Sequence, residues 1–213
     1  MKELNVTPYI NKLKEQRVFW LISIPLIISW CYIFLDFFPN RDGNIGHDYS
    51  YFLPRLLAGY YWFSENGLFN TPYFTPAFCG GDLFYANPQN LYYSLPQLLT
   101  FFINPLSAVS ATFVTFALIG YFGFYYLLRD TFNCHKWASL LGAALFLFNS
   151  FYAYRIIIGH LSFHGFMLIP LIALFLLKRE SNTNWVKSKH SYSIAAALLI
   201  SYILYSGGIA ILL

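Results

Sequence analysis

The sequence predicts an all-α integral membrane protein, a polytopic helical bundle with about five spans and a long outward first loop that carries interfacial helices. Of its 213 residues, 58% are hydrophobic and only 10% are charged, whereas a soluble domain has about 25% charged residues. Several apolar runs are long enough to cross a hydrocarbon core of ~30 Å. The basic residues stand in short groups beside these runs, which indicates membrane flanks and excludes a nucleic-acid-binding surface.

The N-terminal part combines a polar segment with a first span. Residues 1–17 are polar and basic, and the spacing of Tyr9, Ile10 and Leu13 allows a short amphipathic helix on the cytoplasmic membrane surface. Residues 18–38 form an apolar run of roughly 21 residues, which is enough to span the membrane. This run is too long for a signal peptide and no small-residue cleavage site follows it, so we expect an uncleaved first span.

Residues 39–97 form the long loop between the first two spans. Apolar residues recur at helical spacing over 51–63, YFLPRLLAGYYWF, and predict a helix that rests on the lipid headgroups. Residues 70–90 are rich in Pro, Gly and aromatic residues and are expected to form an irregular ordered loop. We expect a second short helix to begin within 88–97. Loops of this length without a role are uncommon, so the loop is the first place to look for function.

Residues 98–213 contain the remaining predicted spans. These lie at 105–128, 137–152, 162–177 and 192–213. If five spans alternate, the basic N-terminus, turn 129–136 and loop 178–189 share one side, which is the cytoplasm by the placement of Lys and Arg. The long loop then faces outward. The last apolar run stops at Leu213 without a polar flank, and we therefore expect the chain to be truncated at its C-terminus.

Asp48 is the first candidate for chemistry. It follows the first span by about ten residues, beside His47, and Gly43 and Gly46 before it allow tight turns. A carboxylate there can accept a proton from an acceptor hydroxyl or amine as a general base, or hold a divalent cation such as Mg²⁺ or Mn²⁺. An alternative role for Asp48 is to cap the helix that follows. Both roles are compatible with the sequence.

Asp82 is a weaker candidate. It follows Gly80 and Gly81 in a turn-like CGGD run. It is therefore either a second carboxylate of an active site or an ordinary turn residue.

A second group of candidates lies in YRIIIGHLSFHG, at the predicted outer membrane edge. Arg155, His160 and His164 offer a guanidinium and imidazole donors, which suit the oxygens of a phosphate or pyrophosphate. The alternative is that the Arg reaches toward lipid headgroups while the His residues pack between helices. His160 and His164 are four residues apart, a spacing also compatible with a metal, but no third ligand is evident and we predict no metal site.

The chain resembles the GT-C superfamily of membrane glycosyltransferases, and most closely the bacterial YfhO-type branch. The segments that carry the resemblance are GHDYSYFLPRL, CGGDLFYANPQNLYYSLPQLL, IIIGHLSFHGFMLIPLIALFLL and YSGG. A basic N-terminus, one span and a long outward loop with an early acidic residue are also typical of this superfamily. The likeness covers most of the chain and corresponds to the N-terminal portion of members, which have more spans and a further C-terminal part.

The resemblance implies a function as well as a fold. It implies an inverting transfer of a sugar from a polyprenyl-phosphate donor to a glycan, lipid or protein acceptor, on the outward face of the bacterial inner membrane. Asp48 would act as the base, Asp82 as a possible second loop carboxylate, and Arg155 and His160 would bind the lipid phosphate. Two other functions remain open: a transporter or flippase of lipid-linked sugars, which does not require Asp48, and a non-catalytic membrane assembly subunit.

Overall fold

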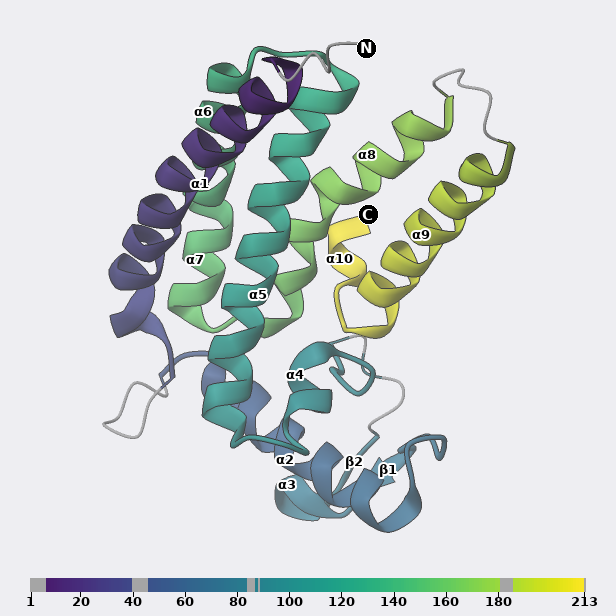
Figure 1. Ribbon diagram of the computed structural model, residues 1–213. Coiled ribbons are helices and arrows are strands. Elements are labelled where there is room, and N and C mark those ends of the chain that lie inside the picture. Colours follow the sequence, from purple (N-terminus) through teal and green to yellow (C-terminus); the bar gives the residue numbers. More distant parts are fainter. Residues whose placement is uncertain (1–6, 40–45, 84–86, 88, 181–185, 213) are drawn as a thin grey trace.

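The computed structural model describes residues 7–39, 46–83, 87, 89–180 and 186–212. They form a bundle of helices with one small strand pair (Figure 1), which is consistent with the predicted all-α membrane protein. Within the described residues, four segments are long and apolar enough to cross a membrane: Gln16–Phe37, Pro105–Thr131, Lys136–Ile158 and Leu161–Lys178. The fifth predicted span, 192–213, corresponds to a shorter apolar helix, His190–Tyr205. The count of five spans therefore stays a prediction.

The elements follow one another along the chain as Figure 1 labels them. They are α1 (Thr7–Phe34), η1 (Leu35–Phe37), α2 (Tyr49–Asn66), β1 (Phe74–Thr75), α3 (Ala77–Gly80), β2 (Asp82–Leu83), α4 (Leu95–Leu99), α5 (Pro105–Tyr126), η2 (Leu127–Thr131), α6 (Lys136–Leu147), α7 (Ser150–Ile158), η3 (Leu161–Leu168), α8 (Ile169–Glu180), α9 (Val186–Tyr205) and α10 (Ile209–Leu212).

The first helix differs from its prediction at its N-terminal side. α1 begins at Thr7, inside the segment 1–17 that was expected to lie as a separate helix on the membrane surface, and continues without a break to Phe34. The residues around the expected break, KLKEQR, favour helix and include neither Gly nor Pro. The apolar part of this helix, Gln16–Phe37, matches the predicted first span at 18–38.

The predicted short span at 137–152 is longer in the structure. α6 and α7 together form the apolar segment Lys136–Ile158, with a joint where Asn149 Oδ1 accepts a hydrogen bond from Tyr152 N (2.7 Å) and caps α7. The predicted span was too short because Arg155 interrupts the apolar run in the sequence. As a result, Arg155 lies in the last turn of α7, near the end of a candidate span.

The basic groups meet at one end of the bundle, which we call the basic end. Lys178 Nζ donates to Asp130 Oδ2 at 2.9 Å and joins α8 to η2. A small cavity between α1, α5 and α6 has Phe19, Arg129 and Lys136 on its wall, so α1 starts at the same end. α2, α3, α4 and the strand pair gather at the opposite end, the loop end (Figure 1).

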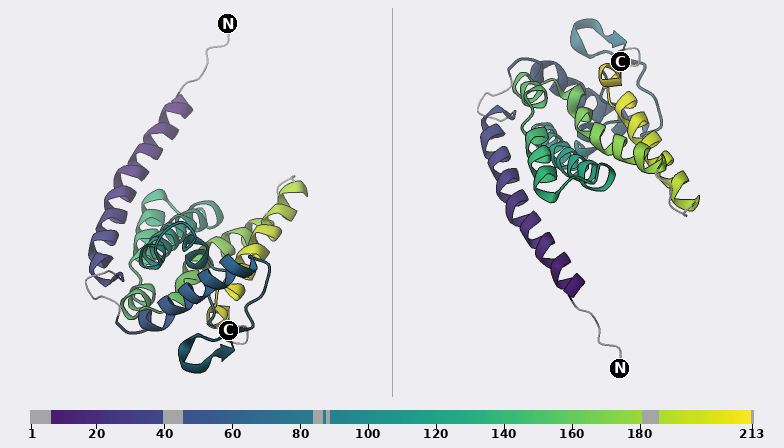
Figure 2. Two further views of the ribbon diagram at one scale, coloured as in Figure 1. Left: turned by 90° about the horizontal axis from the view of Figure 1, so that it is seen from below. Right: turned by 90° about the horizontal axis from the view of Figure 1, so that it is seen from above.

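The helix predicted at 51–63 is confirmed as α2, which lies across the loop end (Figure 2). It buries Phe52, Leu53, Leu56 and Phe63 among its apolar residues, while its backbone carbonyl at Leu56 accepts a hydrogen bond from Gln97 Nε2 (3.1 Å). Outer residues of the same helix, such as Tyr61, remain exposed. α2 is thus an amphipathic helix fixed to the end of the bundle, as its residue pattern indicates.

Part of the loop that was predicted to be ordered but irregular forms regular structure. β1 and β2 pair antiparallel, with Phe74 opposite Leu83 and Thr75 opposite Asp82, in a stretch expected to be irregular. Two-residue strands have no alternating pattern to detect. The second short helix is present as α4, which Ser94 caps by accepting a hydrogen bond from Gln97 N.

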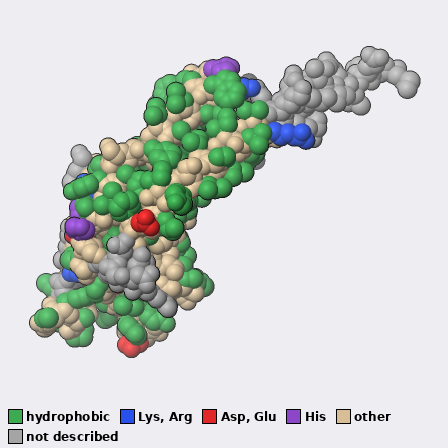
Figure 3. Space-filling model, turned by 90° about the vertical axis from the view of Figure 1, so that its left-hand side faces the viewer, with side chains coloured by type: hydrophobic (Ala, Val, Ile, Leu, Met, Phe, Trp, Pro, Cys, Tyr) green, Lys and Arg blue, Asp and Glu red, His purple; other side chains and the backbone are tan. Residues whose placement is uncertain are grey.

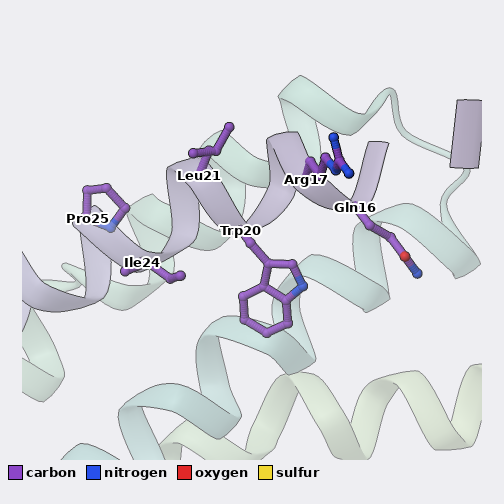
Figure 4. Close-up of a pocket in the computed structure, with 6 residues that line it drawn as sticks. All are labelled: Gln16, Arg17, Trp20, Leu21, Ile24 and Pro25. Carbon is purple, nitrogen blue, oxygen red and sulfur yellow. The ribbon is translucent and has the colours of Figure 1, made fainter. Parts of the chain in front are cut away.

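Aromatic side chains form much of the core, and apolar side chains cover the outside. Trp30 of α1, Phe113 of α5 and Tyr152 of α7 are buried against one another. Hydrophobic side chains also dominate the face shown in Figure 3, as expected for helices that contact lipid. A pocket of about 580 Å³ is lined by residues of α1 near the basic end (Figure 4). Its labelled residues are Gln16, Arg17, Trp20, Leu21, Ile24 and Pro25.

Candidate functional site

The candidate site forms where the start of α2 meets the end of α7. The backbone N–H of Asp48 donates a hydrogen bond to the carbonyl of Ile158 at 3.0 Å. One residue later, the Tyr49 hydroxyl donates to the carbonyl of Ile156 at 2.6 Å. The carbonyl of Ile158, at the C-terminus of α7, gains a partner in this way, and the carbonyl of Ile156, which already accepts from the N–H of Gly159 at 3.2 Å, gains a second one. These two hydrogen bonds fix the start of α2 to the C-terminal end of α7.

Gly159 makes this close approach possible. It ends α7 in the left-handed conformation, with φ of 79°, which L-residues with a Cβ rarely adopt. A Cβ at this position would lie 2.6 Å from the backbone nitrogen of Tyr49 and 2.7 Å from its ring. A glycine is therefore required here both for the turn and for the packing of α2.

The side chain of Asp48 points to His160 and does not cap α2. Its Oδ2 pairs with Nε2 of His160, and it makes no capping hydrogen bond although it occupies the N-cap position. The neighbouring Ser50 hydroxyl donates to the carbonyl of His47 at 2.7 Å. The capping role considered for Asp48 is absent, and its carboxylate instead joins two distant parts of the chain.

Arg155 completes a line of three groups. Its Nη1 contacts Nδ1 of His160. Because a guanidinium has only donors, Nδ1 must accept, and the imidazole proton must then lie on Nε2, facing the carboxylate of Asp48. Asp48, His160 and Arg155 therefore form a chain in which Arg155 donates to a neutral His160 and His160 donates to Asp48.

The surroundings of His160 favour this neutral form. Partial burial lowers the pKa of His160 below its ordinary value of 6.5, and the positive charge of Arg155 acts in the same direction, while the carboxylate of Asp48 opposes both. Near neutral pH the imidazole is therefore uncharged. It acts as an orienting group for the carboxylate, much as a second residue orients a catalytic base in many active sites.

Arg155 lies among aromatic rings and keeps unused donors. Its guanidinium carbon is 4.1 Å from the ring centre of Phe163 and 4.8 Å from that of Phe151, a geometry that stabilises a cation at the membrane edge. Its Nε is buried and has no hydrogen-bond partner among the described residues. A guanidinium with one nitrogen engaged still has donors for an anionic ligand.

The site is open to solvent on the carboxylate side. The side chain of Asp48 is 47% exposed and that of His160 is 27% exposed. One carboxylate oxygen of Asp48 is held by His160, and the other is left to meet a ligand. The group thus combines an oriented, accessible base with a nearby cation.

Two other predicted site residues have different surroundings. His164 is fully buried; its Nδ1 contacts the Leu161 carbonyl (2.5 Å) and its Nε2 contacts the Tyr202 hydroxyl (2.7 Å). Both ring nitrogens are used by the protein, so the structure does not place His164 among the groups open to a phosphate. It matches the helix-packing role considered for it. The backbone of Asp82 pairs with Thr75 in the strand pair, and its side chain lies outside the described part, as does Gly43.

Residues that sequence reasoning missed hold this site in place. Tyr49 anchors α2, and burial raises the pKa of its hydroxyl so that it stays a donor. Phe163 and Phe151 flank Arg155. In a chain with 22% aromatic residues, no local pattern separates these from aromatic residues that face lipid. The position of Tyr49 directly after Asp48 is the one signal that was present.

No metal centre is evident in the described part of the chain, where no three His, Cys, Asp or Glu side chains lie close enough to hold an ion.

Comparison with known proteins adds no family to this picture. No protein-family model matches the chain, and neither a curated protein nor a solved structure matches it. The geometry of the site therefore carries the functional argument.

Proposed function

We propose that this chain carries the active-site end of a membrane glycosyltransferase of the GT-C type. The enzyme transfers a sugar from a polyprenyl-phosphate donor to a glycan, lipid or protein acceptor. The observation that carries the proposal is the Asp48–His160–Arg155 chain, which joins an exposed carboxylate to a cation at the end of a membrane bundle. The transfer needs these two groups: a base for the acceptor and a positive charge for the leaving phosphate.

The location of the site supports a lipid-linked donor. The polyprenyl tail of such a donor stays in the hydrocarbon region while its phosphate and sugar lie at the interface. Arg155 is in the last turn of α7, at the end of a candidate span, and α2 lies across the same end of the bundle (Figure 2). A donor phosphate at the membrane edge would meet Arg155 at this depth.

In the proposed reaction, Asp48 acts on the acceptor and Arg155 acts on the leaving phosphate. Asp48 accepts the proton of an acceptor hydroxyl as the acceptor oxygen forms its bond to the anomeric carbon of the sugar. The bond from that carbon to the phosphate oxygen breaks, and polyprenyl phosphate leaves with both electrons of the bond. The free donors of Arg155 bind the leaving phosphate, and His160 keeps the carboxylate oriented. Attack opposite the leaving group inverts the anomeric carbon.

The orientation in the membrane follows from the charges. Arg17, Arg129, Lys136 and Lys178 belong to segments that meet at the basic end. By the bias of Lys and Arg toward the cytoplasm, the basic end and the N-terminus lie inside. The loop end then faces outward, in the bacterial inner membrane, with five alternating spans if the shorter helix of α9 also crosses.

The test is transfer of radiolabelled sugar from a panel of polyprenyl-phosphate sugars in membranes that contain the protein. We compare the wild type with Asp48→Asn, which removes the charge but keeps the shape and the backbone hydrogen bond to Ile158. General-base catalysis is worth about 10²–10⁴-fold, so we expect a loss of that order. Glu65→Gln is the matched control, because Glu65 is an exposed carboxylate at the other end of α2.

The outcomes are distinct. Transfer by the wild type and by Glu65→Gln, with loss in Asp48→Asn at equal protein level, supports the proposal. Equal transfer by all three proteins removes Asp48 from the mechanism. Movement of the lipid-linked sugar across the membrane without any transfer points to the transporter considered above.

A further inference from the structure

A second cavity lies between the long loop and α9, away from the groups used above. Its volume is about 810 Å³. One wall is formed by loop residues that include Asn87, Asn90 and Tyr93, and the other by the C-terminal half of α9, including Leu198 and Tyr205. We call it the α9 groove. The Tyr202 hydroxyl accepts a hydrogen bond from Leu95 N at 3.0 Å, which fixes α9 to the loop end beside this groove.

The side chain of Asn90 is the feature of the α9 groove that indicates a ligand. Only 9% of Asn90 is exposed, and both its amide oxygen and its amide nitrogen are buried without a hydrogen-bond partner among the described residues. Buried amides in proteins are nearly always paired, because an unpaired group loses its hydrogen bonds to water. An amide that is both donor and acceptor suits a ligand hydroxyl, which is also both.

The backbone holds Asn90 firmly in this position. Its N–H donates to the Asn87 carbonyl at 3.1 Å. Gly207, with φ of 83°, packs so closely that a Cβ there would lie 2.9 Å from the carbonyl oxygen of Asn90. The turn after α9 therefore packs against the loop backbone, and the backbone of Asn90 is fixed before any ligand arrives. Such preorganisation reduces the cost of binding.

The remaining walls of the α9 groove indicate the chemistry of the ligand. None of the described residues that line it is charged, so it offers nothing to pair with a phosphate or carboxylate. The rings of Tyr93 and Tyr205 stand edge to face with centres 6.4 Å apart, and both are exposed. Aromatic faces pack on the C–H faces of sugar rings, while amide and phenol groups bond to the hydroxyls.

The outer surface of α9 suggests how the ligand is carried. Leu198 is 65% exposed and lines the groove, and Ile194, one turn earlier on the same helix, is 59% exposed. An apolar strip therefore leads along α9 into the groove. A ligand with a neutral polar headgroup and a hydrocarbon tail fits both features at once.

We propose that the α9 groove binds the uncharged saccharide headgroup of a membrane lipid, with the sugar at Asn90 and the lipid tail along α9. This binding site is separate from the Asp48 group and does not depend on the proposed transferase activity. The proposal names a class of ligand, a neutral glycolipid, and the residues that recognise it.

The test uses the full chain in phosphatidylcholine nanodiscs and counts retained lipids by native mass spectrometry. The nanodiscs contain glucosyl diacylglycerol, diacylglycerol without sugar, or anionic phosphatidylglycerol. We expect selective retention of glucosyl diacylglycerol. Asn90→Leu should reduce this retention about tenfold, the size of losing one or two hydrogen bonds. Tyr205→Ala should reduce it as well, and since Tyr205 is 65% exposed, this variant should fold normally.

The matched controls are Asn66→Leu and Tyr61→Ala, which change an exposed Asn and an exposed Tyr of α2 outside the α9 groove. Both should retain the glycolipid as the wild type does. Equal retention of all three lipids, a preference for phosphatidylglycerol, or wild-type retention by both Asn90→Leu and Tyr205→Ala would each overturn the proposal.

Discussion

The carboxylate of Asp48 accepts a hydrogen bond from Nε2 of His160, although one residue precedes α2 and the other follows α7. This contact depends on the backbone around it, because the N–H of Asp48 is bonded to Ile158, two residues before His160. Side-chain and backbone contacts thus support one another at the loop end. The predictions below test the parts of this arrangement separately.

Gly159→Ala should detach α2 from α7. The substitution forces an alanine into a left-handed conformation and places its Cβ against the backbone of Tyr49. We expect a loss of about 1–3 kcal/mol in the free energy of unfolding, with a matching fall in activity. Thermal unfolding in nanodiscs measures it. The control is Gly46→Ala, where a Cβ meets nothing within 4 Å; equal effects at the two positions would contradict the packing described here.

Tyr49→Phe should weaken the same junction by a smaller amount. It removes the hydroxyl that donates to Ile156 and leaves a buried carbonyl without that partner. The expected loss is about 1 kcal/mol in unfolding free energy. Tyr61→Phe, which changes a tyrosine that is 62% exposed on α2, should have no measurable effect. Unfolding midpoints for the two variants make the comparison, and a neutral Tyr49→Phe would argue against an anchoring role.

Protonation of His160 should disrupt the site at acidic pH. The pKa of His160 is lower in the folded protein than its ordinary value of 6.5. Its contribution to folding stability is therefore full above that value and is lost as the pH falls through the lowered pKa. The added proton would also turn Nδ1 into a donor facing the Arg155 guanidinium. Unfolding of wild type and His160→Gln from pH 8 to pH 5 should show a larger acid-side loss in the wild type than in the variant.

Arg155→Lys should weaken donor binding even though it keeps the positive charge. Lysine lacks the planar fork that bonds His160 and stacks between Phe163 and Phe151. A hydrogen bond to a charged group is worth about 1.5–3 kcal/mol, which corresponds to at least a tenfold rise in KM for the polyprenyl-phosphate donor. Arg129→Lys at the basic end is the control. An unchanged KM for Arg155→Lys would mean that Arg155 contacts ordinary lipid headgroups.

The sequence predicts the class of fold well because that prediction depends on composition and run length. Few charges and long apolar runs suffice to identify membrane helices. The α2 helix is also predictable from its spacing of apolar residues. The helix boundaries are less predictable. Arg155 interrupts the apolar run, so the last turn of α7 was not predicted as part of a span. The residues before the first span have high helix propensity, so they continue α1 and do not form a separate surface helix.

The candidate site is predictable in its members but not in its contacts. Asp48, His160 and Arg155 stand out as rare polar residues at the predicted membrane edge. These three residues come together only because of the turn at Gly159 and the hydrogen bond of Tyr49. Both are contacts between distant parts of the chain, and no local sequence pattern predicts them. The sequence placed His164 beside His160 by helical spacing, whereas the 3₁₀ geometry of η3 directs His164 into the core.

The most direct test of the central claim is chemical rescue of Asp48→Ala. The variant lacks the carboxylate, and a small carboxylate such as formate can occupy the space and accept the acceptor proton instead. Sugar transfer from the polyprenyl-phosphate donor is measured with increasing sodium formate, against sodium chloride at equal ionic strength. The account predicts that transfer is lost in Asp48→Ala and partly restored by formate alone. Full activity in Asp48→Ala without formate, or a loss in correctly folded protein that formate does not relieve, would contradict a catalytic base at Asp48.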